Sequence, residues 1–239
     1  MLKSVDELKI KIFADGADLS SMLEMNAKPY IQGLTTNPTL MRRAGITDYT
    51  RFAKSVLKEV THKPISFEVF SDELSEMMRQ GIEIASWGKN VYVKIPITTT
   101  LGKSTAPVIE YLTGNGVKVN VTALMTLDQV RHVSEVLDSS IPSYVSIFAG
   151  RIADTGRNPI PIMKEAIDTL KKHSLCELIW ASPRELLNVM QAEEIGCHVI
   201  TATQDILKKL ELVGYDLNSY SLDTVKMFNR DAIEAGYSL

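Results

Sequence analysis

The stretch VYVKIP at residues 91–96 is an apolar, β-branched run that contains a single charged residue, Lys94. A short apolar run of this kind, without polar alternation, is typical of a strand buried on both faces of a parallel sheet. The alternation of side chains along a strand places Lys94 on the same face as Tyr92, opposite the three aliphatic residues. The run therefore predicts a central parallel strand with one lysine inside the fold.

Similar runs recur on both sides of this strand at intervals of roughly 25 to 30 residues, about the size of one βαβ step. Helical periodicity fills the intervals, for example at 48–60 and 72–87. Eight such strands with intervening helices predict a (β/α)8 TIM barrel of the α/β class. An open doubly wound sheet would give much the same periodicity, so this alternative stays open. The predicted strands are Lys11–Ala14, Ile31–Thr35, Ile65–Val69, Val91–Ile95, Val117–Val121, Tyr144–Phe148, Leu178–Ala181 and His198–Thr201.

The chain of 239 residues has the usual length of one barrel, and no linker divides it, so we expect a single domain over residues 1–239. A helical extension is predicted at 217–239. Its large apolar side chains are expected to dock on the barrel or, as we favour, on a neighbouring subunit of a homo-oligomer. These side chains are Leu222, Val225, Met227, Phe228, Ile233 and Tyr237.

Composition excludes several classes of protein. Lys and Arg number 26 against 29 Asp and Glu, giving a net charge of −3 without a basic run, so no nucleic-acid partner is expected. Two cysteines and four histidines without ligand spacing predict neither disulfides nor a metal site. The N-terminal residues 1–11 lack the apolar core of a signal peptide, and no run has membrane-spanning length. We therefore expect a cytoplasmic protein with no membrane association.

Polar side chains follow or interrupt nearly all of the predicted strands, and barrel active sites lie where strands end. Lys94 is the first candidate. A solvated lysine on an edge strand is the usual explanation, but a central parallel strand has no solvated face. Burial disfavours the ammonium form and so supplies a neutral amine that can attack a carbonyl. Lys94 is thus the predicted nucleophile.

Two carboxylates, Asp15 and Glu68, accompany other strands and could transfer protons near this amine. Taken alone, neither carboxylate indicates catalysis, and Asp15 could equally cap a following helix. Asn37 and Asn120 could satisfy loop backbone groups, while Thr122 could cap the next helix. Only their joint occurrence around one lysine favours a catalytic site.

Arg151 and Arg184, with Ser182, are predicted to form an anion site after strands six and seven. Guanidinium groups bind phosphate through two hydrogen bonds, and a helix beginning near Pro183 would add backbone donors. Two ordinary surface arginines are the alternative explanation.

Several short motifs occur along the chain: TTNPTL at 35–40, VKIP at 93–96, NVT at 120–122, SIFAGRI at 146–152, ASPR at 181–184, GC at 196–197 and LKKL at 207–210. In these motifs and in their order the sequence resembles the transaldolase family, and the similarity covers nearly its whole length.

This resemblance implies a reaction without metal or organic cofactor, in which Lys94 forms a Schiff base with a ketose phosphate, sedoheptulose 7-phosphate or fructose 6-phosphate. The retained dihydroxyacetone unit then passes to an aldose phosphate, as in the pentose phosphate pathway. Asp15 would act as acid and base, and Glu68 with Thr122 would hold the catalytic water. The implied substrate contacts are Asn37, Asn120 and Ser146 for the dihydroxyacetone unit, Phe148 as a pocket wall, and Arg151, Ser182 and Arg184 for the phosphate, with Thr36 as a further substrate-binding residue.

Three alternatives remain. A fructose-6-phosphate aldolase would release dihydroxyacetone, but that pattern has Gln in place of Glu68 and lacks the Asn-x-Thr of 120–122. The short chain, the threonines at 98–100 and Pro183 depart from the family pattern, which suits a transaldolase specialised for a modified sugar. A barrel that only binds a phosphorylated metabolite would tolerate Lys94→Arg, whereas imine chemistry would not.

Overall fold

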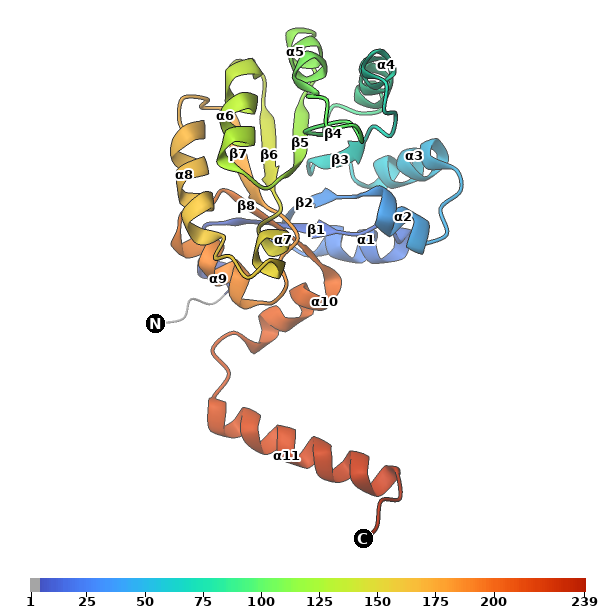
Figure 1. Ribbon diagram of the computed structural model, residues 1–239. Helices are drawn as coiled ribbons and strands as arrows, with labels where there is room; N and C mark the ends of the chain where they lie inside the picture. Colours follow the sequence, from blue (N-terminus) through green and yellow to red (C-terminus); the bar gives the residue numbers. More distant parts are fainter. Residues whose placement is uncertain (1–4) are drawn as a thin grey trace.

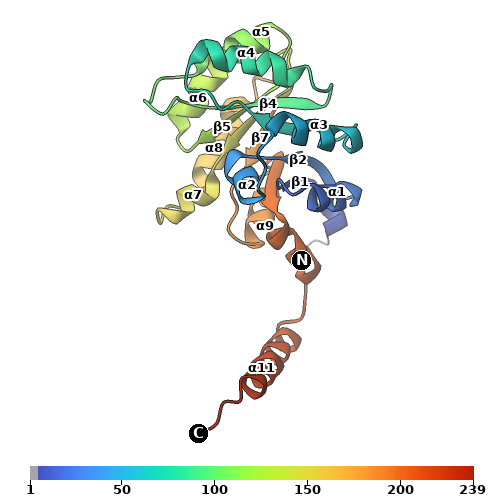
Figure 2. The same cartoon turned by 90° about the vertical axis from the view of Figure 1, so that its right-hand side faces the viewer.

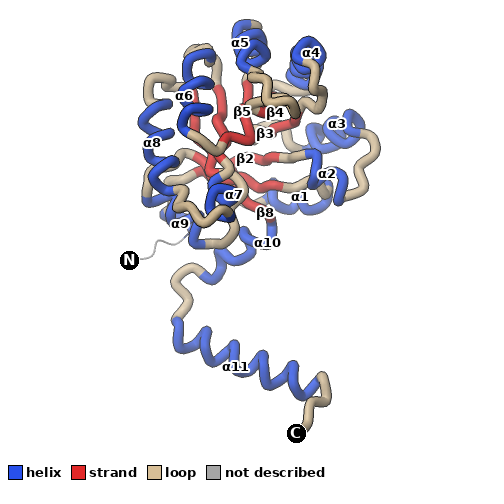
Figure 3. The backbone as a smooth tube through the Cα atoms, in the orientation of Figure 1, coloured by secondary structure: helices blue, strands red, loops and turns tan. Residues whose placement is uncertain are grey.

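The computed structural model, which describes residues 5–239, is a closed barrel of eight parallel strands in sequence order (Figure 1, Figure 3). The predicted (β/α)8 barrel is therefore confirmed, and the open-sheet alternative is wrong. Each predicted strand lies within two or three residues of its observed position. The strands are β1 Lys11–Asp15, β2 Ile31–Thr35, β3 Ile65–Glu68, β4 Val91–Pro96, β5 Val119–Leu124, β6 Ser143–Ile147, β7 Cys176–Trp180 and β8 Val199–Thr203.

Helices surround the barrel and bury their apolar faces against the outer surface of the strands (Figure 1). The two helices predicted from periodicity are α3, capped by Asp48, and α4. The helices around the barrel are α1 Leu19–Ala27, α2 Pro38–Arg43, α3 Tyr49–Glu59, α4 Leu74–Ala85, α5 Ala106–Gly114, α6 Leu127–Val136, α7 Ala149–Asp154, α8 Ile160–Leu170, α9 Leu187–Glu194 and α10 Gln204–Leu207, with short 3-10 turns at Val5–Glu7 and Lys208–Leu212.

Inside the barrel, the aromatic rings of Phe13, Tyr92 and Tyr144 pack together with Ile179 and Val199. Phe13 is 1% exposed and lies edge-on to Tyr144, with ring centroids 5.6 Å apart. Gly33 faces Phe13 from β2, and a Cβ atom at this position would come within 2.5 Å of the ring. Burying a phenylalanine contributes about 1.5–3 kcal/mol, and Gly33 makes the space for it. This aromatic floor closes the barrel below the polar residues of the carboxyl end.

Helix α11, Leu217–Glu234, extends away from the barrel in both views (Figure 1, Figure 2). The predicted C-terminal helix is therefore present. It does not dock on its own barrel, because none of its residues is buried within the part of the chain that the structure describes. Its apolar residues are open to solvent, with Phe228 63% and Ile233 71% exposed. Over the described residues, no helix combines the length and apolar character that a membrane crossing requires.

Candidate active site

A cavity of about 650 Å³ opens at the carboxyl ends of the strands, and it collects side chains from β1 to β8. Eleven of the twelve residues predicted for the site line this cavity. They are Asp15, Asn37, Glu68, Lys94, Asn120, Thr122, Ser146, Phe148, Arg151, Ser182 and Arg184. Residues that are far apart in the sequence thus meet because all the strands run in one direction.

Lys94 lies at the centre of the cavity wall and is 6% exposed. Its Nζ donates a hydrogen bond to the carbonyl oxygen of Thr36 at 3.1 Å and lies 3.4 Å from Oε2 of Glu68. Tyr92 and Lys94 point into the barrel, whereas Val93 and Ile95 pack on the helices, as alternation predicts. The amine is held between a carbonyl and a carboxylate, with its remaining side toward the cavity.

Asp15 and Glu68 share this one cation. Burial raises the pKa of both carboxyl groups above their ordinary values, and the charge of Lys94 opposes the rise at each. The pKa of Glu68 is raised further by the charge of Asp15. Two carboxylates beside one lysine cannot both be fully compensated, so one of them holds a proton more tightly than a free carboxyl does. The cluster is suited to proton transfer.

The hydroxyl of Thr35 fixes the position of Asp15. It donates a hydrogen bond to Oδ1 of Asp15 at 2.8 Å and lies 2.5 Å from the hydroxyl of Thr201. Asp15 is not the cap of α1, because Asp18 accepts the hydrogen bond from the backbone N–H of Ser21. The alternative of a helix cap is therefore wrong for Asp15.

Thr36 is the one predicted site residue whose side chain lies outside the cavity lining. Its hydroxyl donates to the carbonyl oxygen of Ser66, and its own carbonyl accepts from Lys94. Thr35 takes the place in the cavity that was predicted for Thr36. Strand alternation explains the exchange, because neighbouring residues of a strand face opposite sides. Asn37 both caps α2, through Leu40, and reaches Asp15 at 3.4 Å.

Asn120 and Ser146 form a buried chain of hydrogen bonds across β3, β5 and β6. The Ser146 hydroxyl donates to Oδ1 of Asn120 at 2.7 Å, and Nδ2 of Asn120 donates to the Ser66 hydroxyl at 3.0 Å. All three side chains are 3% exposed or less. Because the strands hold each member, this chain presents fixed polar groups beside Lys94, which is paired with Asn120 in the register of β4 and β5.

Thr122 follows Asn120 at a place where β5 is irregular. The pairing register between β5 and β6 shifts between Val121 and Leu124, and Ala123 adopts a positive φ of 65°. Bulges and strained backbone of this kind redirect side chains at functional sites. Thr126 caps α6, so Thr122 is not the cap. Among the described residues the buried hydroxyl of Thr122 has no hydrogen-bond partner, although it borders the cavity.

The far end of the cavity carries the arginines. Arg184 forms a two-pronged ion pair with Asp154, in which Nε lies 3.0 Å from Oδ1, and this contact lowers the pKa of Asp154. The Arg151 guanidinium lies over the Phe148 ring at 5.4 Å. One net positive charge therefore remains at this end. The helix predicted to begin near Pro183 begins only at Leu187, because Ser182 has a positive φ of 59° and the chain turns first.

Gly150 lies where helix α7, which carries Arg151, meets the loop that carries Arg184. A Cβ atom at this position would lie 1.6 Å from the carbonyl oxygen of Ser182, a distance that no side chain tolerates. The absence of a side chain lets the start of α7 touch the segment that carries Ser182 and Arg184. The relative position of Arg151 and Arg184 therefore depends on this glycine.

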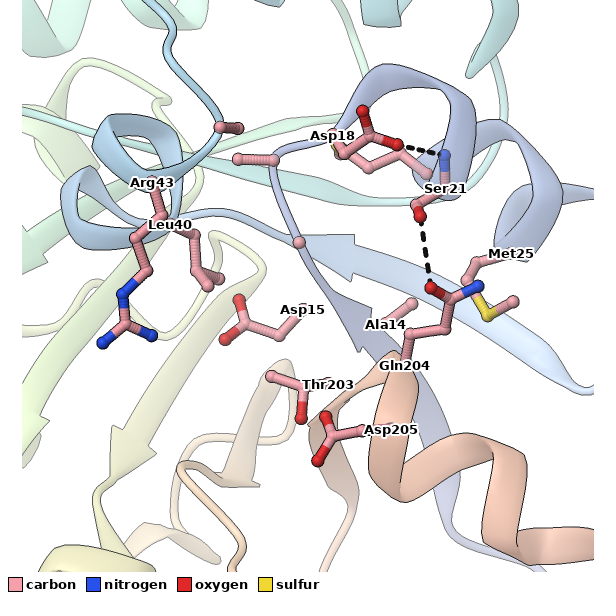
Figure 4. Close-up of a pocket in the computed structure, with 14 residues that line it drawn as sticks. Ala14, Asp15, Asp18, Ser21, Met25, Leu40, Arg43, Thr203, Gln204 and Asp205 are labelled. Atoms are coloured by element: carbon pink, nitrogen blue, oxygen red, sulfur yellow. Dashed lines mark hydrogen bonds between the residues drawn. The ribbon is translucent and has the colours of Figure 1, made fainter. Parts of the chain in front are cut away.

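A smaller cavity of about 410 Å³ adjoins the first and shares five lining residues with it: Asp15, Leu40, Arg43, Thr203 and Asp205 (Figure 4). Sequence reasoning missed Arg43, Thr201, Thr203 and Asp205. The threonines follow the same rule of strand ends, which could have been applied to β8. Arg43 and Asp205 lie on helices beyond the strands, where the sequence carries no comparable signal.

The raised pKa of Asp15 predicts that its carboxylate costs stability. A carboxyl whose pKa is higher in the folded than in the unfolded protein stabilises the fold when protonated and destabilises it above the folded pKa. We expect Asp15→Asn to be more stable than the parent at pH 7, by on the order of 1 kcal/mol, with the gain fading as the pH falls and lost below about pH 4, where the carboxyl is protonated in both the folded and the unfolded protein. Urea unfolding at several pH values measures this. Asp18→Asn, at an exposed cap, is the control and should give no gain; a loss of stability in Asp15→Asn at pH 7 would contradict the prediction.

The closed barrel and the polar cavity at the carboxyl ends of its strands place the protein among the (β/α)8 barrels whose cavity has the position of an active site. The model of the family described as Transaldolase/Fructose-6-phosphate aldolase matches residues 12–238. The chain belongs to this transaldolase/fructose-6-phosphate aldolase family, as the motifs predicted.

Curated relatives agree with this family. A "Probable transaldolase" of Thermoanaerobacter sp. (strain X514) is 30% identical over 91% of this chain and 95% of its own length. A "Probable transaldolase" of Sulfurihydrogenibium sp. (strain YO3AOP1) is 33% identical over 84% of this chain and 88% of its own. Among solved structures, a 2,3-dimethylmalate lyase of the PEP mutase/isocitrate lyase superfamily is similar with a TM-score of 0.53, at 12% identity, over 98% of this chain and 86% of that one. That similarity concerns the fold alone.

Proposed function

We propose that this transaldolase-family enzyme transfers a dihydroxyacetone unit from a ketose phosphate to an aldose phosphate through an imine on Lys94. The observation that carries the proposal is the buried amine beside two carboxyl groups with raised pKa. A lysine amine in such a site attacks a ketone and splits a difficult C–C cleavage into easier steps. Fructose 6-phosphate and sedoheptulose 7-phosphate are the proposed donors.

The proposed reaction uses these positions in turn. Lys94 Nζ attacks the C2 carbonyl of the ketose, and the carbinolamine loses water to give the imine. Asp15 takes the proton of the C4 hydroxyl as the C3–C4 bond breaks, and the electron pair of that bond moves into the imine to form an enamine. The aldehyde leaves, an acceptor aldehyde bonds to the enamine carbon, and Asp15 returns the proton. Hydrolysis of the new imine releases the product ketose.

The other residues of the site are assigned by their contacts. We propose that Glu68 and Thr122 hold the water that is lost and regained at the imine carbon. The unpaired hydroxyl of Thr122 is available for such a water. Asn37, Asn120 and Ser146 are proposed to bind the hydroxyls of the dihydroxyacetone unit, with Phe148 as a wall.

Arg151, Ser182 and Arg184 are proposed to bind the phosphate. They lie at the end of the cavity away from the amine-bearing strand, and one net positive charge remains there after the pairing of Arg184 with Asp154. A ketose with another anionic group would bind at the same end of the cavity. Comparing the rates with phosphorylated ketoses and with such modified ketoses as donors shows which of these sugars is the substrate.

An aldolase that releases free dihydroxyacetone is the second candidate. Glu68 and the Asn-x-Thr at 120–122 favour transfer, by resemblance to the transaldolase pattern. The distinction is measurable with fructose 6-phosphate as donor, alone and with erythrose 4-phosphate. Transfer requires the acceptor for product formation, whereas an aldolase releases dihydroxyacetone without it.

A homo-oligomer in the cytoplasm is also part of this proposal. The exposed apolar side chains of α11 support association, because contiguous apolar surface of this kind usually marks a contact with another chain. Light scattering of the full chain measures the mass in solution. A monomer at all concentrations would contradict this part and leave the catalytic proposal intact.

The test of the central proposal is borohydride reduction in the presence of fructose 6-phosphate, followed by intact mass measurement and peptide mapping. Reduction fixes an imine as a stable secondary amine on the lysine that formed it. We expect an adduct on Lys94 with the mass of the reduced three-carbon unit or of the whole sugar phosphate. The absence of an adduct with this and other ketoses would overturn the Schiff-base mechanism and favour a barrel that only binds.

A further inference from the structure

The carboxyl end of β3, which carries Glu68, lies beside a gap in the barrel wall. β2 and β3 are paired only at Leu34 with Ile65 and at Thr35 with Ser66. The last backbone hydrogen bond between them runs from the Thr36 N–H to the Ser66 carbonyl. After Thr36 the chain leaves the barrel, since α2 begins at Pro38. The backbone of Glu68 is thus left without a strand neighbour on that side.

The side of the strand that faces the gap is fixed by alternation. Val69 donates its N–H to the Lys94 carbonyl of β4, whereas the Ser66 carbonyl accepts from β2. In a parallel strand the N–H and C=O of one residue point to the same side, and successive residues alternate. Both polar backbone groups of Glu68 therefore point toward the missing part of β2. Unpaired backbone groups at such a place are costly.

Tyr49 fills this gap with one hydroxyl group. Its hydroxyl donates to the Glu68 carbonyl oxygen at 2.9 Å and accepts from the Glu68 N–H at 2.7 Å. The hydroxyl thus substitutes for both hydrogen-bonding groups of a neighbouring strand. Burial raises the pKa of Tyr49, so its hydroxyl keeps its proton at neutral pH and can both donate and accept a hydrogen bond.

The tyrosine itself is held firmly. It is the first residue of α3, directly after the cap Asp48, which accepts from the Arg51 N–H at 2.9 Å. Its ring packs edge-on against Phe67 and Phe70, with centroids 6.3 and 5.2 Å away. The ring of Trp87 is tilted relative to it, with centroids 5.8 Å apart. A rigid helix start and an aromatic cluster therefore hold the hydroxyl in place.

We infer that Tyr49 is a positioning residue, whose hydroxyl aligns the backbone of Glu68 so that its carboxylate meets Lys94 and the reacting water. The contact is 3.4 Å between Lys94 Nζ and Glu68 Oε2, and the Glu68 side chain reaches it from the residue that Tyr49 clamps. This inference rests on the function proposed for Glu68. Small displacements of positioned groups lower turnover strongly while leaving substrate binding nearly unchanged.

A double-mutant cycle tests it, with Tyr49→Phe, Glu68→Gln and the double variant, using fructose 6-phosphate and erythrose 4-phosphate. Tyr49→Phe keeps the ring and removes the hydroxyl, whereas Glu68→Gln removes the carboxylate and keeps the backbone. We expect Tyr49→Phe to lower kcat about tenfold with KM within about twofold, and to change kcat less than about twofold in the Glu68→Gln background. Equal losses in both backgrounds, or no loss in the parent, would overturn the inference.

Two further measurements keep the outcomes distinct. Tyr144→Phe removes the hydroxyl of another largely buried tyrosine, whose ring packs on Tyr92 in the barrel floor with centroids 4.4 Å apart, and should leave kcat within about twofold. Borohydride trapping on the parent protein separates the two proposals. An adduct on Lys94 with kcat unaffected by Tyr49→Phe contradicts only the positioning role, while no adduct at all contradicts the proposed function beneath it.

Discussion

Lys94→Arg is expected to abolish transfer, with kcat lowered on the order of 10⁴-fold or more. Arginine keeps the positive charge beside Glu68 but stays protonated, so it has no free electron pair with which to attack the ketone. Binding of fructose 6-phosphate is proposed to depend on the arginines at the other end of the cavity, so it should persist. The measurement is steady-state turnover, together with the shift in Tm that saturating fructose 6-phosphate produces.

Lys103→Arg, a substitution in the exposed loop after β4, is the matched control and should keep the parent activity. Circular dichroism shows whether each variant folds, because the longer arginine must fit a site that is 6% exposed. Retention of more than about a tenth of the activity by Lys94→Arg would contradict imine catalysis. If Lys94→Arg loses activity but keeps the Tm shift that fructose 6-phosphate produces, Lys94 is needed for the reaction and not for binding.

Removing either arginine of the anion end is expected to weaken the use of phosphorylated donors selectively. A hydrogen bond to a charged group contributes about 1.5–3 kcal/mol, so Arg151→Ala should lower kcat/KM for fructose 6-phosphate about 10- to 100-fold. Unphosphorylated fructose cannot make this contact, so its kcat/KM should stay within about twofold. The ratio of the two values measures the phosphate contribution. Arg184→Ala should behave similarly.

Arg157→Ala is the control, since this exposed arginine bonds Thr155 and does not line the cavity. Asp154→Asn tests the ion pair directly. It releases Arg184 from its partner and raises the positive charge of the anion end, so the ratio should not fall. Equal losses for both donors would show that Arg151 acts on the fold or the chemistry, and would contradict a phosphate site.

The fold could be predicted because its signals are local. The run at 91–96 and its seven counterparts are recognisable from residue type and length, and strand direction then brings their ends together. Eleven of the predicted site residues lie in one cavity for this reason. Thr36 is the predicted site residue that does not line the cavity, whereas its neighbour Thr35 does, because successive residues at the end of β2 face opposite sides.

Other features depend on contacts between distant segments and could not be inferred from the sequence. The pairing of Arg184 with Asp154, the contact of Gly150 with Ser182 and the clamp of Tyr49 on Glu68 each join separate loops or helices. Arg43 and Asp205 border the cavity from helices that the sequence pattern places only approximately. Such contacts arise from packing angles, which propensity and periodicity do not encode.

The two ends of the cavity differ in how they are built, and this bears on how such enzymes diversify. The residues around Lys94 and the Ser66–Asn120–Ser146 chain are fixed within the strands, so substitutions there disturb neighbours on several sides. The arginine end is built from the short helix α7 and the loop that follows β7, which an exposed ion pair between Arg184 and Asp154 joins. Under the proposed function, selection can therefore change the acceptor and the anionic group that are bound at the arginine end while the residues around Lys94 stay the same.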